Sequence, residues 1–494
     1  MSWKDAAEPV LTRMPVVARP EGHVPFKRKL LWTAGVLGIY FFLTNIALFG
    51  LDVDAGSDIF GQFRSILAGG QGSVLQVGIG PIVTASIVLQ LLGGANLLGL
   101  DTDNDPRDQV LYQGLQKLLV LIVTAATAAP MVFTGNFLPA SQTVGNALGI
   151  GVTGVQLLIF AQVFVGGILI LFMDEIVSKW GVGSGVGLFI IAGVSQQLIG
   201  GLFSWSGLGA TGLFASWYGI LFGDIGLGPT FTAQWFQSLL FDPGNILALV
   251  TTLLIFGIVV YAESVRVEIP LSHARVRGAR GRFPVKLIYA SVLPMILVRA
   301  LQANVQFVGQ IIYSQMGDSM PALLGVYPDS QLEPVDGFFY YVAPIQARAD
   351  WMWFLGRTPA GIDPWQIGLR VAIDLTFMVV GGAIFAIFWV ETTGMGPEAT
   401  AKQIQNSGMQ IPGFRRNPQV VEKVMERYIP QVTVIGGALV GLLAVMANML
   451  GTIGNVSGTG LLLTVSITYK LYEEIAEEQM MEMHPMMRQM FGDE

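Results

Sequence analysis

Three ionisable residues lie within long apolar stretches of this sequence: Asp174, Arg299 and Asp374. A charge in an apolar environment is costly and commonly serves to bind an ion, relay a proton or pair with another charge. In a secondary transporter, Arg299 and Asp374 would form part of the solute site. They are equally compatible with a structural pair between two helices, or with an arginine that extends its head towards water. Three scattered charges make a poor relay for protons or ions. We therefore keep a secondary transporter only as the less favoured hypothesis.

Other residue types that carry chemistry are few and far apart. The chain has no cysteine, which excludes disulfides and thiolate sites, and His23, His273 and His484 lie in separate polar segments. It has no HExxH zinc motif, no serine elbow and no cluster of carboxylates in the apolar stretches. We therefore predict no enzymatic reaction, no cofactor and no metal site.

A glycine-rich stretch, GVGSGVGLFI at 181–190, has the outward form of a phosphate-binding loop. It does not follow a predicted strand, and the acidic partner about 20 residues on that a dinucleotide site needs is missing. We reject a Rossmann site. Small residues here instead favour close helix approach, or a thin wall that faces a pore.

Composition indicates the setting of these residues. Of 494 residues, 52% are hydrophobic and 12% are charged, whereas a soluble domain has roughly 25% charged residues. The mean hydropathy is +0.60. These values predict a membrane protein. The net charge of −7 is compatible with an acidic surface suited to high salt, or with ordinary variation.

A helix needs about 20 mostly apolar residues to cross the hydrocarbon layer. Ten stretches qualify, which predicts an all-α polytopic protein with ten transmembrane helices. The second, fifth and tenth are short, rich in glycine or interrupted by polar residues, as is typical of helices that line a cavity. The ten lie near residues 30–51, 77–94, 110–132, 154–173, 183–200, 245–262, 287–312, 367–390, 429–450 and 457–472.

Charge asymmetry predicts the orientation. About 22 of the 27 lysine and arginine residues lie in the N-terminal segment, the even-numbered loops and the tail, and about 4 lie in the odd-numbered loops. By the positive-inside rule both termini are cytoplasmic. Residues 1–29 lack the pattern of a cleavable signal peptide. Within them, residues 2–14 are compatible with an interfacial amphipathic helix or with a disordered tail.

The predicted organisation is an N-terminal half at 30–200, an external loop at 201–244, a C-terminal half at 245–472 and a cytoplasmic tail at 473–494. A second long external loop covers 313–366. The cytoplasmic loops 263–286 and 391–428 are basic, so they are candidates to bind phosphates; the alternative is a role in topology and lipid anchoring alone. The candidate docking residues in these loops are Arg275, Arg277, Arg280, Arg415 and Arg416.

Residues 77–93, VGIGPIVTASIVLQLLG, resemble the second transmembrane segment of the SecY family and of its counterpart in the endoplasmic reticulum, and the loop at 391–415 resembles the archaeal or eukaryotic form of the family. The motif GIGPIVTA is highly specific. Further matches follow in family order across the membrane core: QKLL at 116–119, GVGSGVGLFIIAGVSQ at 181–196, ANVQ at 303–306, ETTGMGPEATAKQIQNSGMQIPGFR at 391–415, RYIP at 427–430 and GTGLLLTVSITYKLYE at 458–473. The long external loops and the N-terminal extension depart from the family.

The resemblance implies two pseudo-symmetric inverted halves, spans one to five and six to ten, around an hourglass pore. It also implies a constriction of aliphatic side chains that dewets and so excludes ions while a peptide can fill it. Spacing of i,i+4 puts two members on one face of each of two helices. The matching positions are Ile79, Val83, Val186, Ile190, Ile296 and one of Leu462 or Leu463, of which we favour Leu463.

The resemblance further implies a plug helix near 57–68, a segment too short and too polar to span. It implies a lateral gate between spans two and seven, with polar gate residues at Thr84, Thr127 and Asn304. Such groups would hold two helices together reversibly. For a single threonine, a hydrogen bond to its own helix is the ordinary alternative.

The implied function is the central channel of the protein translocase in the cell membrane, which passes secretory polypeptides and releases transmembrane segments into lipid. The implied partners are SecE and a small beta subunit in a heterotrimer, the ribosome with its rRNA, the signal-recognition-particle pathway, and signal sequences and nascent chains. A transporter or an inert scaffold are the alternatives.

Overall fold

The computed structural model describes most of the chain. The described residues are 3–22, 24–52, 64–94, 98–100, 105–134, 137–205, 212–222, 226, 231–241, 243–273, 280–286, 293–328, 333–355, 362–393, 395–406, 409–410, 418–454 and 456–483.

Ten long helices form the body of the described structure. They are α2 (Phe26–Thr44), α4 (Gly80–Gly94), α5 (Pro106–Phe133), α7 (Gly151–Trp180), α8 (Gly185–Phe203), α11 (Ile246–Ser264), α12 (Leu293–Met316), α14 (Pro364–Thr392), α16 (Pro418–Leu450) and α17 (Gly458–Met483). Shorter helices connect them: α1 (Trp3–Leu11), α3 (Arg64–Leu67), α6 (Gln142–Leu148), α9 (Leu213–Phe222), α10 (Ala233–Leu240), α13 (Phe338–Val342), α15 (Pro397–Asn406) and the single turns η1 (Gly317–Ser319), η2 (Arg348–Asp350) and η3 (Trp353–Leu355).

The ten predicted spans correspond one to one with the ten long helices. Within the described residues, seven of these helices are long and apolar enough to cross a membrane by length and composition. The other three are α4, which has only 15 residues, and α2 and α17, which carry charged residues at one end. The first span was predicted too long: α2 ends at Thr44, because the chain then turns and Leu48 N–H donates to Gly72 O at 2.8 Å.

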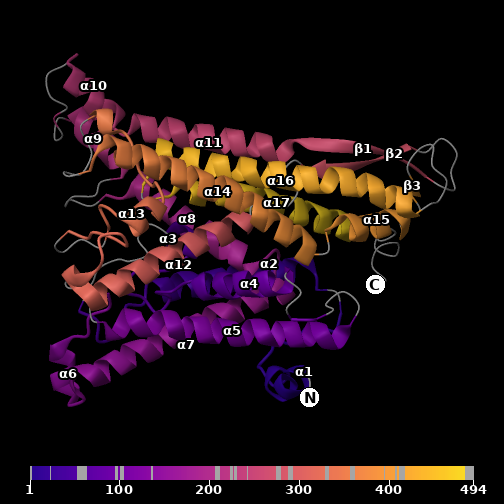
Figure 1. The fold of residues 1–494 in the computed structure, drawn as a ribbon, viewed down its shortest axis with the longest axis horizontal. Coiled ribbons are helices and arrows are strands. Elements are labelled where there is room, and N and C mark those ends of the chain that lie inside the picture. The colour runs from indigo at the N-terminus through magenta and orange to yellow at the C-terminus, as the bar shows by residue number, and fades with distance from the viewer. Residues whose placement is uncertain are drawn as a thin grey trace.

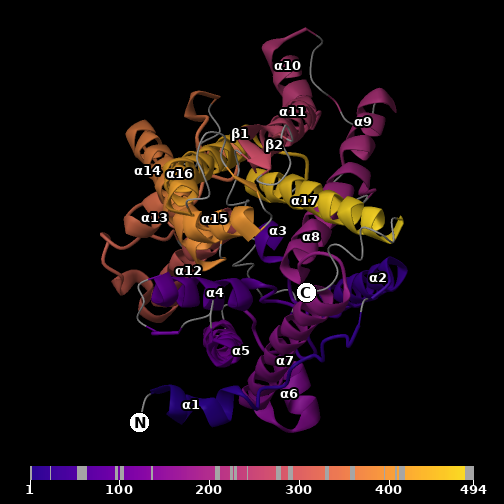
Figure 2. The same ribbon diagram turned by 90° about the vertical axis from the view of Figure 1, so that its right-hand side faces the viewer.

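The helices form two groups with α3 and α8 between them. In Figure 2 the indigo-to-purple helices α2, α4, α5 and α7 occupy one side, and α11, α14, α16 and α17 occupy the other. The N-terminal segment is helical at α1, as one of the two sequence-based alternatives proposed. Lys4 Nζ lies 2.7 Å from Asp108 Oδ2, which places α1 against the start of α5.

A small antiparallel sheet, which the sequence analysis missed, lies at one end of the bundle (Figure 1). Strands β1 (Arg266–His273), β2 (Arg280–Lys286) and β3 (Met409–Gln410) pair in the order β2-β1-β3. The sheet therefore joins the two basic loops. We call the end with α1, α15 and this sheet the sheet end; α6, α9, α10 and α13 lie at the opposite end (Figure 1).

Helices α14 and α16 cross at unusually short range because glycines meet at the crossing. A Cβ built on Gly437 would lie 2.5 Å from Gly382 O, and one on Gly441 would lie 2.3 Å from Met378 O. Glycines four residues apart let helix backbones approach closely in a membrane, where association depends on packing and not on the hydrophobic effect.

Replacement of Gly437 by valine should therefore separate α14 from α16. Overpacking of this kind costs about 1–3 kcal/mol, so we expect a lower unfolding temperature for the purified protein in detergent. Gly368→Val on α14 is the control, because no atom lies within 4 Å of the added Cβ. Equal unfolding temperatures for the two variants would contradict the close crossing.

Candidate functional site

The aliphatic residues predicted from the sequence converge on the central apolar cluster of the molecule. Five of them are at most 4% exposed and belong to that cluster, and Val186 is partly buried and packs against it. These five are Ile79, Val83, Ile190, Ile296 and Leu463. Leu462 is also buried in the cluster, so burial does not choose between it and Leu463.

Hydrogen bonds at helix starts orient two pairs of these residues. Ile79 precedes the first residue of α4, yet Val83 N–H donates to Ile79 O at 3.1 Å, so the two side chains keep the predicted i,i+4 relation. At the start of α8, Val186 N–H donates to Asp174 Oδ1 at 2.9 Å. Asp174 thus satisfies a free backbone donor of α8, which accounts for one of the three charges singled out in the sequence. A Cβ on Gly185 would lie 2.5 Å from Asp174, which confirms the expected close helix approach.

The predicted plug segment is described from Arg64 onwards, and residues 57–63 lie outside the described residues. Helix α3 packs between the two halves against α8, and its buried Ile66 belongs to the same cluster as the aliphatic residues. The turn after it is held by hydrogen bonds from Ile79 N–H to Leu67 O at 2.8 Å and from the Tyr40 hydroxyl to Ala68 O at 3.0 Å. The segment is therefore fixed to both α2 and α4.

The three polar residues predicted between spans two and seven meet in space. Asn304 Nδ2 of α12 donates to Thr84 Oγ1 of α4 at 2.9 Å. Thr127 of α5 lines the same small cavity as these two residues. Among the described side chains, this one hydrogen bond joins α4 to α12 at the cavity, with α5 beside them.

The two remaining intramembrane charges form a pair. Arg299 Nη1 of α12 lies 3.3 Å from Asp374 Oδ1 of α14, and both side chains are at most 1% exposed. Of the alternatives left open by the sequence, the structure shows the pair between helices.

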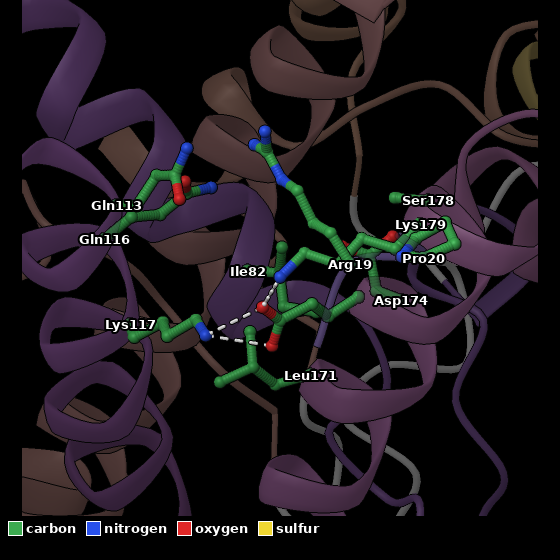
Figure 3. A pocket seen from close by; sticks show the side chains of 11 residues that line it. Arg19, Pro20, Ile82, Gln113, Gln116, Lys117, Leu171, Asp174, Ser178 and Lys179 are labelled. Carbon is green, nitrogen blue, oxygen red and sulfur yellow. Dashed lines mark hydrogen bonds and ion pairs between the residues drawn. The ribbon is translucent and has the colours of Figure 1, made fainter. Parts of the chain in front are cut away.

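The N-terminal segment lines a cavity of about 550 Å³ that the sequence analysis did not foresee (Figure 3). Arg19 and Pro20 form one wall, and α4, α5 and α7 form the others. Glu175 accepts from Lys117 and Lys179 at 2.8 and 2.7 Å (Figure 3). The same lysines donate to Pro15 O and Val17 O, and Trp180 Nε1 donates to Ala18 O. Residues 15–18 are thereby held across α5 and α7, and because the acceptors are backbone carbonyl groups, the sequence does not reveal this contact.

Four of the five predicted docking arginines lie outside the described residues. These four are Arg275, Arg277, Arg415 and Arg416, and Arg280 is the first residue of β2. In the part of the chain that the structure describes, no group of three or more His, Asp or Glu residues is placed to hold a metal ion.

Comparisons with known proteins agree with this geometry. The SecY family model matches residues 73–472, and a model described as the plug domain of Sec61p matches residues 39–72. The protein translocase subunit SecY of Haloferax volcanii is 76% identical, and that of Haloarcula marismortui is 72% identical; both matches cover 100% of each chain. A solved structure described as that of a protein conducting channel is 36% identical with a TM-score of 0.78, over 97% of this chain and 98% of that one. Sec61 in the canine ribosome-channel complex from the endoplasmic reticulum has a TM-score of 0.75 at the same identity and coverage.

A double-mutant cycle on Thr84→Val and Asn304→Leu should reveal the hydrogen bond between α4 and α12. Interhelical hydrogen bonds in membrane proteins contribute about 0.6 kcal/mol on average and at most about 1.7 kcal/mol, so we expect a coupling of this size in the free energy of unfolding. Thr127→Val with Asn304→Leu is the control pair, because no hydrogen bond of the described side chains joins them, and its coupling should be near zero. Equal coupling in both cycles would contradict the assignment.

Proposed function

The chain belongs to the SecY family and is a protein translocase subunit, and we propose that its central aliphatic cluster contains the constriction of a channel for polypeptides. The constriction consists of Ile79, Val83, Val186, Ile190, Ile296 and Leu463. The observation that carries this proposal is their convergence, from α4, α8, α12 and α17, on one buried apolar cluster together with Ile66 of the plug segment.

The apolar lining accounts for a seal that needs no charged barrier. A narrow apolar constriction holds few waters and dewets, so a small ion would have to shed its hydration shell in order to cross. An extended polypeptide fills the constriction with its own side chains. The plug segment adds apolar contacts from the side of α3, and it must leave the cluster when a chain passes.

Sideways release into lipid is assigned to the boundary between α4 and α12, with Thr84, Thr127 and Asn304 as its polar residues. The boundary is held by a single hydrogen bond of described side chains, Asn304 to Thr84. Because such a bond is weak, an apolar signal helix that packs between α4 and α12 offsets its loss. Polypeptides and apolar segments then take different exits from one pore.

The protein is a multi-pass membrane protein, and we place the sheet end in the cytoplasm. The positive-inside count supports this orientation, since the N-terminal segment and both basic loops meet at that end (Figure 1).

The proposed partners are SecE and a small beta subunit in a heterotrimer, the signal-recognition-particle pathway, nascent chains with their signal sequences, and the surrounding lipid. Chemical energy comes from such a partner, because we assign the chain no enzymatic reaction.

The basic loops are the proposed contact for the ribosome. The β1-β2-β3 sheet joins them into one unit, which would present Arg275, Arg277 and Arg280 together with Arg415 and Arg416 to rRNA phosphates. A ribosome-bound relative, canine Sec61, has the same fold over 97% of this chain.

A single cysteine at Ile190 tests the channel. The chain contains no other cysteine, so a thiol-reactive crosslink reports this position alone. We expect the Ile190→Cys protein, in a complex with its partner subunits, to crosslink to a stalled secretory nascent chain. Ile199→Cys on the same helix is the control, because Ile199 is 58% exposed on the outer surface of the bundle. Equal crosslinking at both positions, or none at Ile190, would contradict a central path.

Charge reversal of Arg415 and Arg416 to glutamate tests the docking proposal. Affinity falls as salt concentration rises, and each phosphate contact that is lost should reduce the steepness of log affinity against log salt concentration by about 0.7–0.9. We expect weaker co-sedimentation with ribosomes and a smaller salt slope. Replacement of Arg370 by glutamine, which removes one positive charge at the opposite end, should leave the slope unchanged. A slope that does not respond to the loop variant would refute direct contact with rRNA.

A further inference from the structure

Helix α12 carries a line of polar side chains that its role in the gate does not explain. Arg299, Gln302 and Gln306 follow one another at spacings of three and four residues, so they lie on one face of the helix. All three are at most 7% exposed. We call them the polar stripe.

The polar stripe binds the backbone of an external segment, residues 337–346, that contains α13. Gln302 Nε2 donates to Val342 O at 2.8 Å, and Gln306 Nε2 donates to Phe339 O at 2.9 Å. Within the helix pair, Gln302 Nε2 also donates to Asp374 Oδ1 at 3.0 Å, and Arg299 Nη1 donates to Gln302 Oε1 at 2.6 Å.

Helix α14 holds the same segment from its other side. Ile345 N–H donates to Asp374 Oδ2 at 3.2 Å. Arg370 donates to Ala343 O at 3.2 Å and to Pro344 O at 2.9 Å. Its guanidinium carbon lies 4.9 Å from the centre of the Tyr340 ring, within the range of a cation–π contact. Segment 337–346 is thus hydrogen-bonded to both α12 and α14.

The polar stripe lies on the face of α12 opposite to the gate. At 3.6 residues per turn, Gln302 and Gln306 each point about 160° away from Asn304 around the helix axis. Asn304 is the residue that reaches Thr84 of α4. A helix that is hydrogen-bonded at three levels along one face cannot rotate without breaking those bonds, so the stripe determines where the opposite face points.

We propose that Arg299, Gln302, Gln306 and Asp374 are positioning residues of the lateral gate. They fix the rotation of α12 by joining it to segment 337–346 and α14, which makes these three elements one body during gating. The gate then opens by separation of α4 from α12, and not by movement of α12 along the external segment. This inference rests on the gate assignment given above.

Stability alone is a poor explanation for these residues. Well-packed apolar residues in place of a buried ion pair are often neutral or stabilising, and the Nε and Nη2 of Arg299 have no acceptor among the described residues. A polar core has directional bonds that an apolar core lacks. The expected effect of the stripe is therefore on signal selectivity, which a merely structural role would not change.

Two crosslinks separate the rigid unit from the gate. A Cβ on Gly309 would lie 2.7 Å from the Cγ of Phe339, and one C–C bond of about 1.5 Å separates that Cγ from its own Cβ. Gly309→Cys with Phe339→Cys therefore places the two Cβ atoms at most about 4.2 Å apart, a separation compatible with a disulfide, which would lock α12 to segment 337–346. Thr84→Cys with Asn304→Cys, joined by a short thiol crosslinker, locks α12 to α4.

Each protein is compared with its own uncrosslinked form, in the reconstituted complex with its partner subunits. We expect the 309–339 lock to leave translocation of a signal-bearing substrate within about twofold and the 84–304 lock to lower it at least about tenfold. If the 84–304 lock has no effect, the gate assignment itself is wrong. If both locks lower the rate tenfold, α12 moves along segment 337–346 and the present inference alone is overturned.

The variant Gln302→Leu tests the polar stripe directly. It removes both amide donations, so α12 gains rotational freedom, and a substrate with a shortened apolar signal should pass about fivefold faster while one with a full signal is unchanged. The 309–339 disulfide in the same variant should restore selectivity. Met316→Ala, at an exposed position at the end of the same helix, is the control. Unchanged selectivity in Gln302→Leu would refute the role of the stripe, and the two locks decide the matter if that variant fails to accumulate.

Discussion

Backbone that is not helical must find its hydrogen bonds inside the protein when it lies among membrane-spanning helices. Among the described residues, segment 68–79, after α3, and segment 337–346, at the end opposite to the sheet end, face that requirement. In the first, the N–H and C=O groups bond to neighbouring loops, as in Val74 N–H to Ile46 O and Leu48 N–H to Gly72 O. In the second, side chains of α12 and α14 supply the partners. The places where the fold departs from helices therefore determine where its polar residues must lie.

This requirement divides the interior into two kinds of contact. The contacts at the centre are apolar and have no preferred direction. Its side chains can therefore separate and close again around substrates of any sequence. The polar contacts lie at the joints around it: Asp174 at the start of α8, Thr84 with Asn304 between α4 and α12, and the polar stripe behind α12. In the proposed gate, directional bonds fix the helices that keep their orientation, and among the described side chains one weak hydrogen bond, from Asn304 to Thr84, lies where the helices part.

Much of the fold was predictable because a bilayer leaves few alternatives. Runs of about 20 apolar residues predicted all ten long helices, and motif positions predicted that Thr84 and Asn304 would meet. The β1-β2 hairpin was missed although Val267, Ile269 and Leu271 alternate along β1, because Pro270 and Pro284 and the basic residues around them favour a loop. The bond between residues 15–18 and the lysines of α5 and α7 was missed because backbone acceptors leave no pattern in a sequence. The glutamines of α12 were visible as a stripe, but nothing in sequence spacing identifies carbonyl groups 30 to 40 residues away as their partners.

The contacts of Arg299 and Asp374 argue against the hypothesis that this chain is a secondary transporter of a small solute. A solute or ion site requires charge that a ligand can reach and neutralise. Asp374 is already occupied, because its Oδ1 accepts from Arg299 and Gln302 and its Oδ2 accepts from Ile345 N–H. An entering cation would have to displace three donors and leave Arg299 buried without its partner, which costs several kcal/mol. The charges that first suggested a solute site are therefore fixed in structural contacts, and the path that we propose for polypeptides runs through the apolar cluster instead.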